Sequence, residues 1–140
     1  MIEQGFYIEK EIPEKWWTMV FYNIETEEEL SKVFGSLLAF GLSVEDANNA
    51  IKLLVNPNTG YIISNENLSM SIILISKATS FDEMFNTVTH EIKHLSEHIC
   101  SKFGYDSKSE KAAYIQGEIG QNMYKAVAIA VCPKCNCKNH

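Results

Sequence analysis

The sequence carries four helix-start signals, and their positions limit how the chain can fold more than any other feature. Each signal is a Ser or Thr followed three residues later by an acidic side chain, which is the pattern of a capping box or a weaker form of it. The four signals are Thr26 with Glu29, Ser43 with Asp46, Ser80 with Glu83, and Ser107 with Glu110. Apolar residues at helical spacing follow each signal, so we expect four helices that end near residues 40, 54, 103 and 131.

Three segments outside these helices have the composition of strands. Residues 16–24, 61–63 and 68–75 are rich in aromatic and β-branched side chains. The polar residues 64–67 predict a hairpin between the last two segments, and the turn residues Pro57, Asn58 and Gly60 precede it. This order of elements predicts an α+β fold, with a small antiparallel sheet packed on several helices.

The composition fits one globular domain. With 140 residues, of which 46% are hydrophobic and 21% charged, the chain can bury a core of its own. We expect residues 1–131 to form a single domain and residues 132–140 to form a Cys-rich tail. Twelve Lys and Arg against 18 Asp and Glu give a net charge of -6, which argues against nucleic acid as a partner.

The sequence also predicts a cytoplasmic location without a membrane partner. The N-terminus lacks the basic region and apolar stretch of a signal peptide. The longest apolar runs, 72–75 and 126–132, are far shorter than the roughly 20 residues that span a bilayer. Three of the four cysteines crowd into the tail, so no disulfide framework is expected, and Cys100 is predicted to be a small buried apolar residue.

The tail offers four side chains that could bind a second metal ion: Cys132, Cys135, Cys137 and His140. A C-x-x-C pair is a common zinc half-site. A single residue between Cys135 and Cys137, however, leaves little chain to surround a tetrahedral ion. We favour a reduced tail without fixed structure, and a site shared between two chains stays open.

Three of the four histidines fall within nine residues of the predicted third helix, at His90, His94 and His98. Residues 90–94 form the sequence H-E-x-x-H. Helical residues four apart lie about 6 Å apart along the axis on nearly the same face, so two imidazoles can bind one zinc ion. Glu91 lies beside them, where it can accept a proton from a zinc-bound water. His98 lies about 12 Å along the axis from His90, too far to share the ion, so we expect it to be exposed or to support the ligands from behind.

Residues 81–128 resemble the short H-E-x-x-H metallopeptidases of the gluzincin type that are found in bacteriophages and prophages. The resemblance rests on the H-E-x-x-H motif, on Thr87 three residues before its first histidine, and on the sequence E-K-A-A-Y at 110–114. It implies a minimal zincin-like domain, in which the helix with the motif is followed by a helix that carries a further ligand.

The resemblance implies a zinc-dependent peptidase or peptidase-like hydrolase. Its Zn²⁺ would be bound by His90, His94 and Glu110, and Glu91 would be the catalytic residue that activates a zinc-bound water. A peptide or protein substrate would lie extended along the sheet edge, as in larger zincins. The alternative is a non-catalytic phage-type structural or interaction protein that retains the fold, in the host cytoplasm or the virion. The oligomeric state stays open.

Two carboxylates of the predicted fourth helix are candidates for the third ligand, Glu110 and Glu118. A simple antiparallel hairpin that turns near Asp106 would bring Glu118 level with His94, whereas the family pattern selects Glu110, which we rank first. A capping box would also explain Glu110 without any metal. For Tyr114 we favour a core aromatic residue over a donor to a reaction oxyanion.

Overall fold

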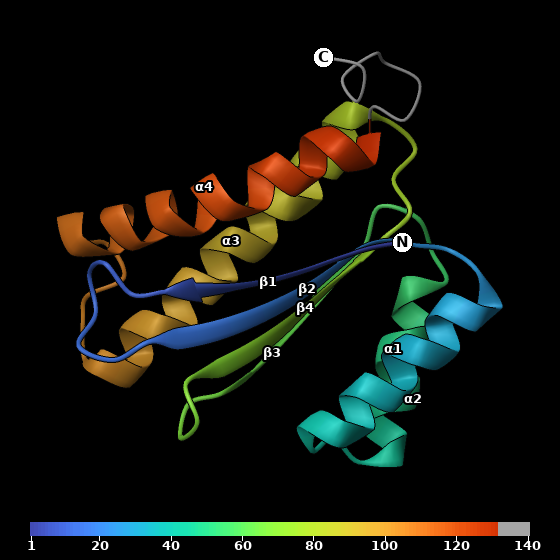
Figure 1. The fold of residues 1–140 in the computed structure, drawn as a ribbon, viewed down its shortest axis with the longest axis horizontal. Helices are drawn as coiled ribbons and strands as arrows, with labels where there is room; N and C mark the ends of the chain where they lie inside the picture. The colour runs from blue at the N-terminus through green and yellow to red at the C-terminus, as the bar shows by residue number, and fades with distance from the viewer. Residues whose placement is uncertain (132–140) are drawn as a thin grey trace.

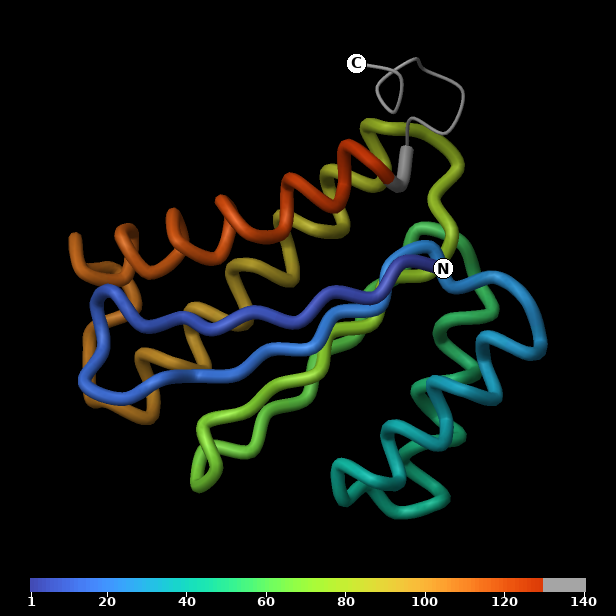
Figure 2. Tube along the Cα trace, in the orientation of Figure 1, coloured from blue at the N-terminus to red at the C-terminus, as the bar shows by residue number. Residues whose placement is uncertain are grey.

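A computed structural model describes residues 1–131, which form a four-stranded sheet with a pair of helices on each face (Figure 1). The strands are β1 (Ile2–Ile8), β2 (Trp16–Ile24), β3 (Gly60–Asn65) and β4 (Met70–Ser76). The helices are α1 (Glu27–Phe40), α2 (Val44–Leu54), α3 (Phe81–Phe103) and α4 (Glu110–Val131). Helices α1 and α2 cover one face of the sheet, and α3 and α4 cover the other (Figure 2). The four tail residues predicted as possible metal ligands lie outside the described residues.

The sheet has the strand order β1-β2-β4-β3. The pairs β1–β2 and β3–β4 are antiparallel, and β2 runs parallel to β4. The predicted α+β class is confirmed, but the sheet is mixed and not wholly antiparallel. The reason is the helical crossover through α1 and α2, which carries the chain from β2 to the hairpin and allows β4 to lie parallel to β2. This order leaves β3 at one edge of the sheet.

Three of the four predicted helix starts are confirmed. Thr26 and Glu29 form a complete capping box at α1. The side chains of Ser43 and Ser80 cap α2 and α3 by accepting a hydrogen bond from the third backbone N–H of each helix. Gly104 ends α3 in the left-handed conformation, with φ 74°, as the sequence predicted.

The predicted start of α4 is wrong by two residues. The backbone N–H of Ala112 donates to the Ser109 hydroxyl oxygen at 3.2 Å, so Ser109 caps the helix and Glu110 is its first residue. Asp106 accounts for the shift, because its carboxylate accepts the backbone N–H of Lys108 at 2.9 Å and holds a turn where Ser107 was expected to cap. Glu110 therefore does not occupy the capping-box position.

Each face of the sheet carries its own hydrophobic core. In β4, Ile73 and Ile75 belong to the core beneath α3 and α4, whereas Ile72 and Leu74 belong to the core beneath α1 and α2. This alternation follows from the period of two in a strand. Cys100 is buried in the first core, as predicted.

The sequence analysis missed β1. Its interior holds Glu3, Gln4 and Gly5, which are poor strand formers, and its exposure alternates as expected of a half-covered edge strand. The strand is held from both sides: its residues pair with β2, and the Gln4 amide donates to the backbone oxygen of Asn122 in α4 at 2.8 Å. None of the helices among the described residues is both long and apolar enough to cross a membrane.

Candidate metal centre

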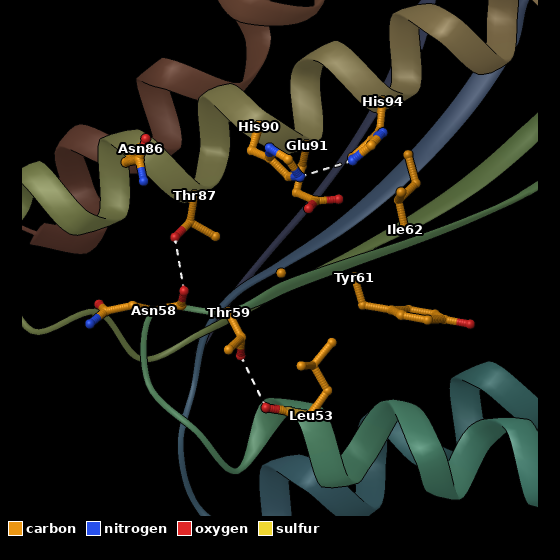
Figure 3. Close-up of a pocket in the computed structure, with 11 residues that line it drawn as sticks. Leu53, Asn58, Thr59, Tyr61, Ile62, Asn86, Thr87, His90, Glu91 and His94 are labelled. Carbon is orange, nitrogen blue, oxygen red and sulfur yellow. Dashed lines mark hydrogen bonds between the residues drawn. The ribbon is translucent and has the colours of Figure 1, made fainter.

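Helix α3 places the H-E-x-x-H residues at the rim of the sheet. Its apolar face, which includes Val88, Leu95 and Ile99, is buried in the first core. A rotation of about 100° per residue turns His90 and His94 away from that face toward the edge strand β3. The face of α3 that carries the two histidines therefore meets β3 in a cleft (Figure 3).

His90, Glu91 and His94 form a group whose possible ligand atoms all lie within 4.8 Å of one another. The two Nε2 atoms of the histidines are 2.9 Å apart, and their rings are nearly perpendicular at 87°. Two nitrogens bonded at about 2.0 to 2.1 Å to one tetrahedral zinc ion stand about 3.3 Å apart. A small widening of the pair would therefore admit the ion. Donor type and spacing both fit a zinc ion.

Glu97 lies beside this pair on α3. One of its carboxylate oxygens is 3.5 Å from Nδ1 of His94. A carboxylate at that nitrogen favours the tautomer with the proton on Nδ1, which leaves the Nε2 lone pair directed at the position between the two histidines.

The carboxyl group of Glu91 is buried, with the residue only 4% exposed. Its Oε2 atom has no hydrogen-bond partner among the described residues. Burial raises the pKa of Glu91 from its usual value to about 7. A buried carboxyl without a partner is costly to keep in a fold, and such groups concentrate at functional sites.

Gly60 makes room for Glu91, and the sequence analysis missed this role because it assigned Gly60 to a turn. In the structure Gly60 opens β3, and a Cβ atom there would lie 2.9 Å from both Cγ and Oε1 of Glu91. Only a residue without a side chain lets the strand pass so close to the carboxyl group. No signal local to Gly60 could have shown this, because the contact depends on how α3 packs against β3.

The cleft beside this group has a volume of about 420 Å³. The turn before β3, β3 itself, one residue of α2 and residues 86–94 of α3 form its walls (Figure 3). Its lining residues are Leu53, Asn58, Thr59, Gly60, Tyr61, Ile62, Asn86, Thr87, His90, Glu91 and His94. Thr87 also ties the two walls together, because its hydroxyl donates to the backbone oxygen of Asn58 at 3.4 Å.

The structure does not bring the predicted ligand Glu110 into this group. Its carboxylate accepts a hydrogen bond from the Tyr114 hydroxyl at 2.9 Å on the surface of α4. Tyr114 is 57% exposed, so the expectation of a core aromatic residue there is wrong. Glu118 is also engaged elsewhere: its two oxygens accept the backbone N–H groups of Glu9 and Lys10 at 2.9 and 3.1 Å.

The position of α4 explains why its carboxylates are remote. Phe85 of α3 stacks on Tyr124 of α4 with ring centroids 5.0 Å apart, and the Ser96 hydroxyl of α3 donates to the backbone oxygen of Ala112 at 3.4 Å. At about 100° per residue, Phe85 and Ser96 lie roughly 150° around α3 from the two histidines. Helix α4 therefore packs on the side of α3 that faces away from the cleft.

His98 lies outside the group, as its distance along the helix predicted. Its Nδ1 atom is 2.6 Å from the hydroxyl oxygen of Ser64 in β3. Burial lowers the pKa of His98, and the neighbouring His94 lowers it further. The partner was missed because Ser64 was assigned to the hairpin loop, whereas it continues β3.

Comparison of the chain with protein-family models, with curated proteins and with solved structures finds no match. The structure itself supports a group of His90, Glu91 and His94 on α3 that could hold a metal ion.

Proposed function

We propose that the chain is a metal-dependent hydrolase that cleaves peptides, with His90 and His94 as ligands of a zinc ion and Glu91 as the catalytic base. The observation that carries the proposal is the buried Glu91 carboxyl group, which has an unpartnered oxygen and lies beside two imidazoles at the wall of a cleft. A zinc ion in this place supplies a Lewis acid that increases the acidity of water and polarises a carbonyl group.

Glu91 is suited to move a proton in both directions. Its carboxylate accepts the proton that water loses when it attacks a peptide carbonyl carbon, and the resulting carboxylic acid passes that proton to the leaving amine. In the metal-free protein, burial raises the pKa of Glu91 to about 7, so the carboxyl group is not held in one protonation state near neutral pH. The unpartnered Oε2 atom of Glu91 supports the same role, since no hydrogen bond to that oxygen must break before the proton moves.

The edge strand β3 favours an extended peptide as substrate. The backbone N–H of Ser76 donates to the oxygen of Thr59, which makes this the first hydrogen-bonded pair of the β3–β4 ladder. Because such pairs alternate, the backbone groups of Gly60, Ile62 and Ser64 point away from β4 toward the open edge. A peptide that pairs with these groups as an added strand would pass along the cleft in front of the two histidines.

Two substitutions test the proposal in protein that carries no His-tag. His94→Ala should abolish stoichiometric zinc, measured by elemental analysis after zinc loading and dialysis. Glu91→Gln should keep the zinc and lower the hydrolysis of a peptide library, followed by mass spectrometry, by at least about a hundredfold. Glu83→Gln, an exposed change in the first turn of α3, is the matched control and should behave as the wild type.

Less than about a tenth of an equivalent of zinc in the loaded wild type would refute the metal site. An unaltered rate in Glu91→Gln would remove Glu91 from the mechanism.

A paired test of Glu110→Gln and Glu118→Gln would identify the third protein ligand of the metal. Zinc affinity and the free energy of unfolding of the metal-free protein would be measured for both. Glu118→Gln should soften the fold and keep the zinc, since Glu118 holds the backbone at Glu9 and Lys10. A loss of zinc in Glu110→Gln alone would make Glu110 the ligand, which requires α4 to move toward the cleft.

A second candidate function is a structural or interaction protein that uses the metal only to stabilise its fold. The placement of Glu110 away from the histidines favours it, because the group then has fewer protein ligands than the resemblance implies. Under this alternative, zinc binding persists and no member of a broad peptide library is cleaved.

A further inference from the structure

A chain of four hydrogen-bonded side chains crosses the sheet and ends on α3. The indole nitrogen of Trp16 in β2 lies 2.9 Å from the Ser71 hydroxyl oxygen in β4. The hydroxyl oxygens of Ser71 and Ser64 are 2.6 Å apart, and Ser64 is 2.6 Å from Nδ1 of His98. Three strands are thus connected to the helix that carries the candidate metal centre.

Only the first hydrogen bond in this chain has a fixed direction: the indole N–H of Trp16 can only donate, so the Ser71 oxygen accepts from it. A hydroxyl oxygen can accept two hydrogen bonds, so the other two bonds can run in either of two directions. Either Ser71 donates to Ser64 and Ser64 donates to Nδ1 of His98, or the Nδ1–H group donates to Ser64 and Ser64 donates to Ser71.

Two other hydrogen bonds join α3 to the segments that flank β3, from Thr87 to the backbone oxygen of Asn58 and from Lys102 to the Ser69 hydroxyl. The contacts of α3 with the strands themselves include many apolar side chains. Val88, Leu95 and Ile99 fill the first core, and hydrophobic burial does not by itself fix the rotation or translation of a helix. Hydrogen bonds are directional, so the bond between Ser64 and His98 selects one register.

That register is the one that forms the cleft. From Glu91 to His98 the helix advances about 10.5 Å, and from Gly60 to Ser64 the strand advances about 13 Å, so two contacts between the elements lie at similar spacing along both. Gly60 meets Glu91, and Ser64 meets His98. Between these contacts Ile62 and His94 line the same cleft (Figure 3).

We propose that Ser64 and His98 are positioning residues, which hold α3 in register with β3 and so keep His94 and Glu91 in the geometry that binds the metal. The inference rests on the proposed function for its effect on metal binding, although the register itself exists without metal. His98 and Ser64 act through the placement of α3, and neither belongs to the group of possible ligands.

The first experiment uses the metal-free protein. Nitrogen-15 NMR of the histidine side chains should identify the ring nitrogen of His98 that carries the proton, and an NOE should connect the His94 ring with the Ile62 methyl groups. Ser64→Ala should abolish or strongly weaken this NOE. Ser96→Ala removes a hydroxyl hydrogen bond from the opposite side of α3 and should leave the NOE unchanged.

The second experiment measures the affinity and the visible absorption spectrum of cobalt(II), with urea unfolding of each metal-free variant in parallel. Ser64→Ala and His98→Leu should weaken cobalt binding about tenfold and shift the spectrum, the size of effect found for groups that orient metal ligands. His98→Asn offers an oxygen near the position of Nδ1 and should restore both. Ser96→Ala should retain both.

An unchanged NOE and unchanged cobalt affinity in Ser64→Ala would overturn the inference. Wild-type protein that binds no cobalt would refute the proposed function, and the NOE comparison would then decide the register alone.

Discussion

Gly60 is the residue at which β3 passes beside the Glu91 side chain of α3. Glu91 occupies the space that a side chain at position 60 would need, because its Cγ and Oε1 atoms would lie 2.9 Å from a Cβ at that position. We predict that Gly60→Ala destabilises the metal-free protein by about 1–3 kcal/mol in urea unfolding, the usual cost of overpacking, and weakens zinc binding.

Two further variants separate this clash from a general effect of alanine. In Glu91→Ala the space is free, so Gly60→Ala should cost much less there, and the difference measures the coupling of the two residues. Gly35→Ala lies in α1, where a Cβ meets nothing within 4 Å, and should stabilise by about 0.5–1 kcal/mol. An equal cost of Gly60→Ala with and without Glu91 would contradict the explanation.

At the level of single residues, the sequence predicts local geometry well and contacts between distant segments poorly. The His90–His94 pair could be predicted because four residues of one helix fix their spacing. The roles of Gly60 and Ser64 could not, since they depend on which strand lies beneath α3. Glycine is common both in turns and where a strand begins, so the identity of Gly60 did not show whether it ends the turn or begins β3.

Among the elements, α4 shows how a helix can be predicted correctly and still be given the wrong start. Ser109 caps it, whereas Ser107 lies in the preceding turn. We predict that Ser109→Ala lowers the free energy of unfolding by about 1 kcal/mol, the typical value of an N-cap, and that Ser107→Ala changes it by less than about half as much. Urea denaturation followed by circular dichroism gives both values. The reverse order would restore Ser107 as the cap.

The face of α3 on which α4 packs could not be predicted from the hairpin alone. The register predicted from a turn near Asp106 placed Glu118 level with His94 along the helix axis. It did not predict whether the Glu118 side chain faces the histidines. Phe85 contacts Tyr124, and Glu118 accepts hydrogen bonds from the backbone N–H groups that follow β1. These contacts hold α4 against β1. Apolar spacing predicts that a helix is amphipathic without saying which neighbour covers it.

On the scale of the whole molecule, the two cores share one sheet, so damage to one should unfold both. Leu37 of α1 is fully buried in the core between that helix and the sheet, and its neighbour Leu38 is 36% exposed. We predict that Leu37→Ala costs about 2–5 kcal/mol and Leu38→Ala clearly less. Trp16 lies in the core on the opposite face. In a Trp17→Phe background, the fluorescence of Trp16 should therefore report the same lowered urea midpoint as circular dichroism, as expected for a two-state domain. A fluorescence midpoint that stays at the wild-type value would show that the two faces unfold separately.

The α+β class follows from the order of elements along the chain, whereas the parallel pairing of β2 with β4 and the existence of β1 do not. Strand β1 has a weak local preference and exists because β2 and α4 cover it. Pairings of this kind are decided by tertiary packing, which no local pattern encodes.

The cleft is assembled from one continuous stretch of chain, because its lining residues run from Leu53 to His94. The contacts that tie α4 to β1 join far more distant residues, with a sequence separation of 118 between Gln4 and Asn122. Short loops close at lower entropic cost and faster than long ones. During synthesis from the N-terminus, the histidine pair and its strand leave the ribosome before α4 does. We therefore expect a nascent chain to be able to capture a metal ion before α4 packs onto β1 and completes the domain.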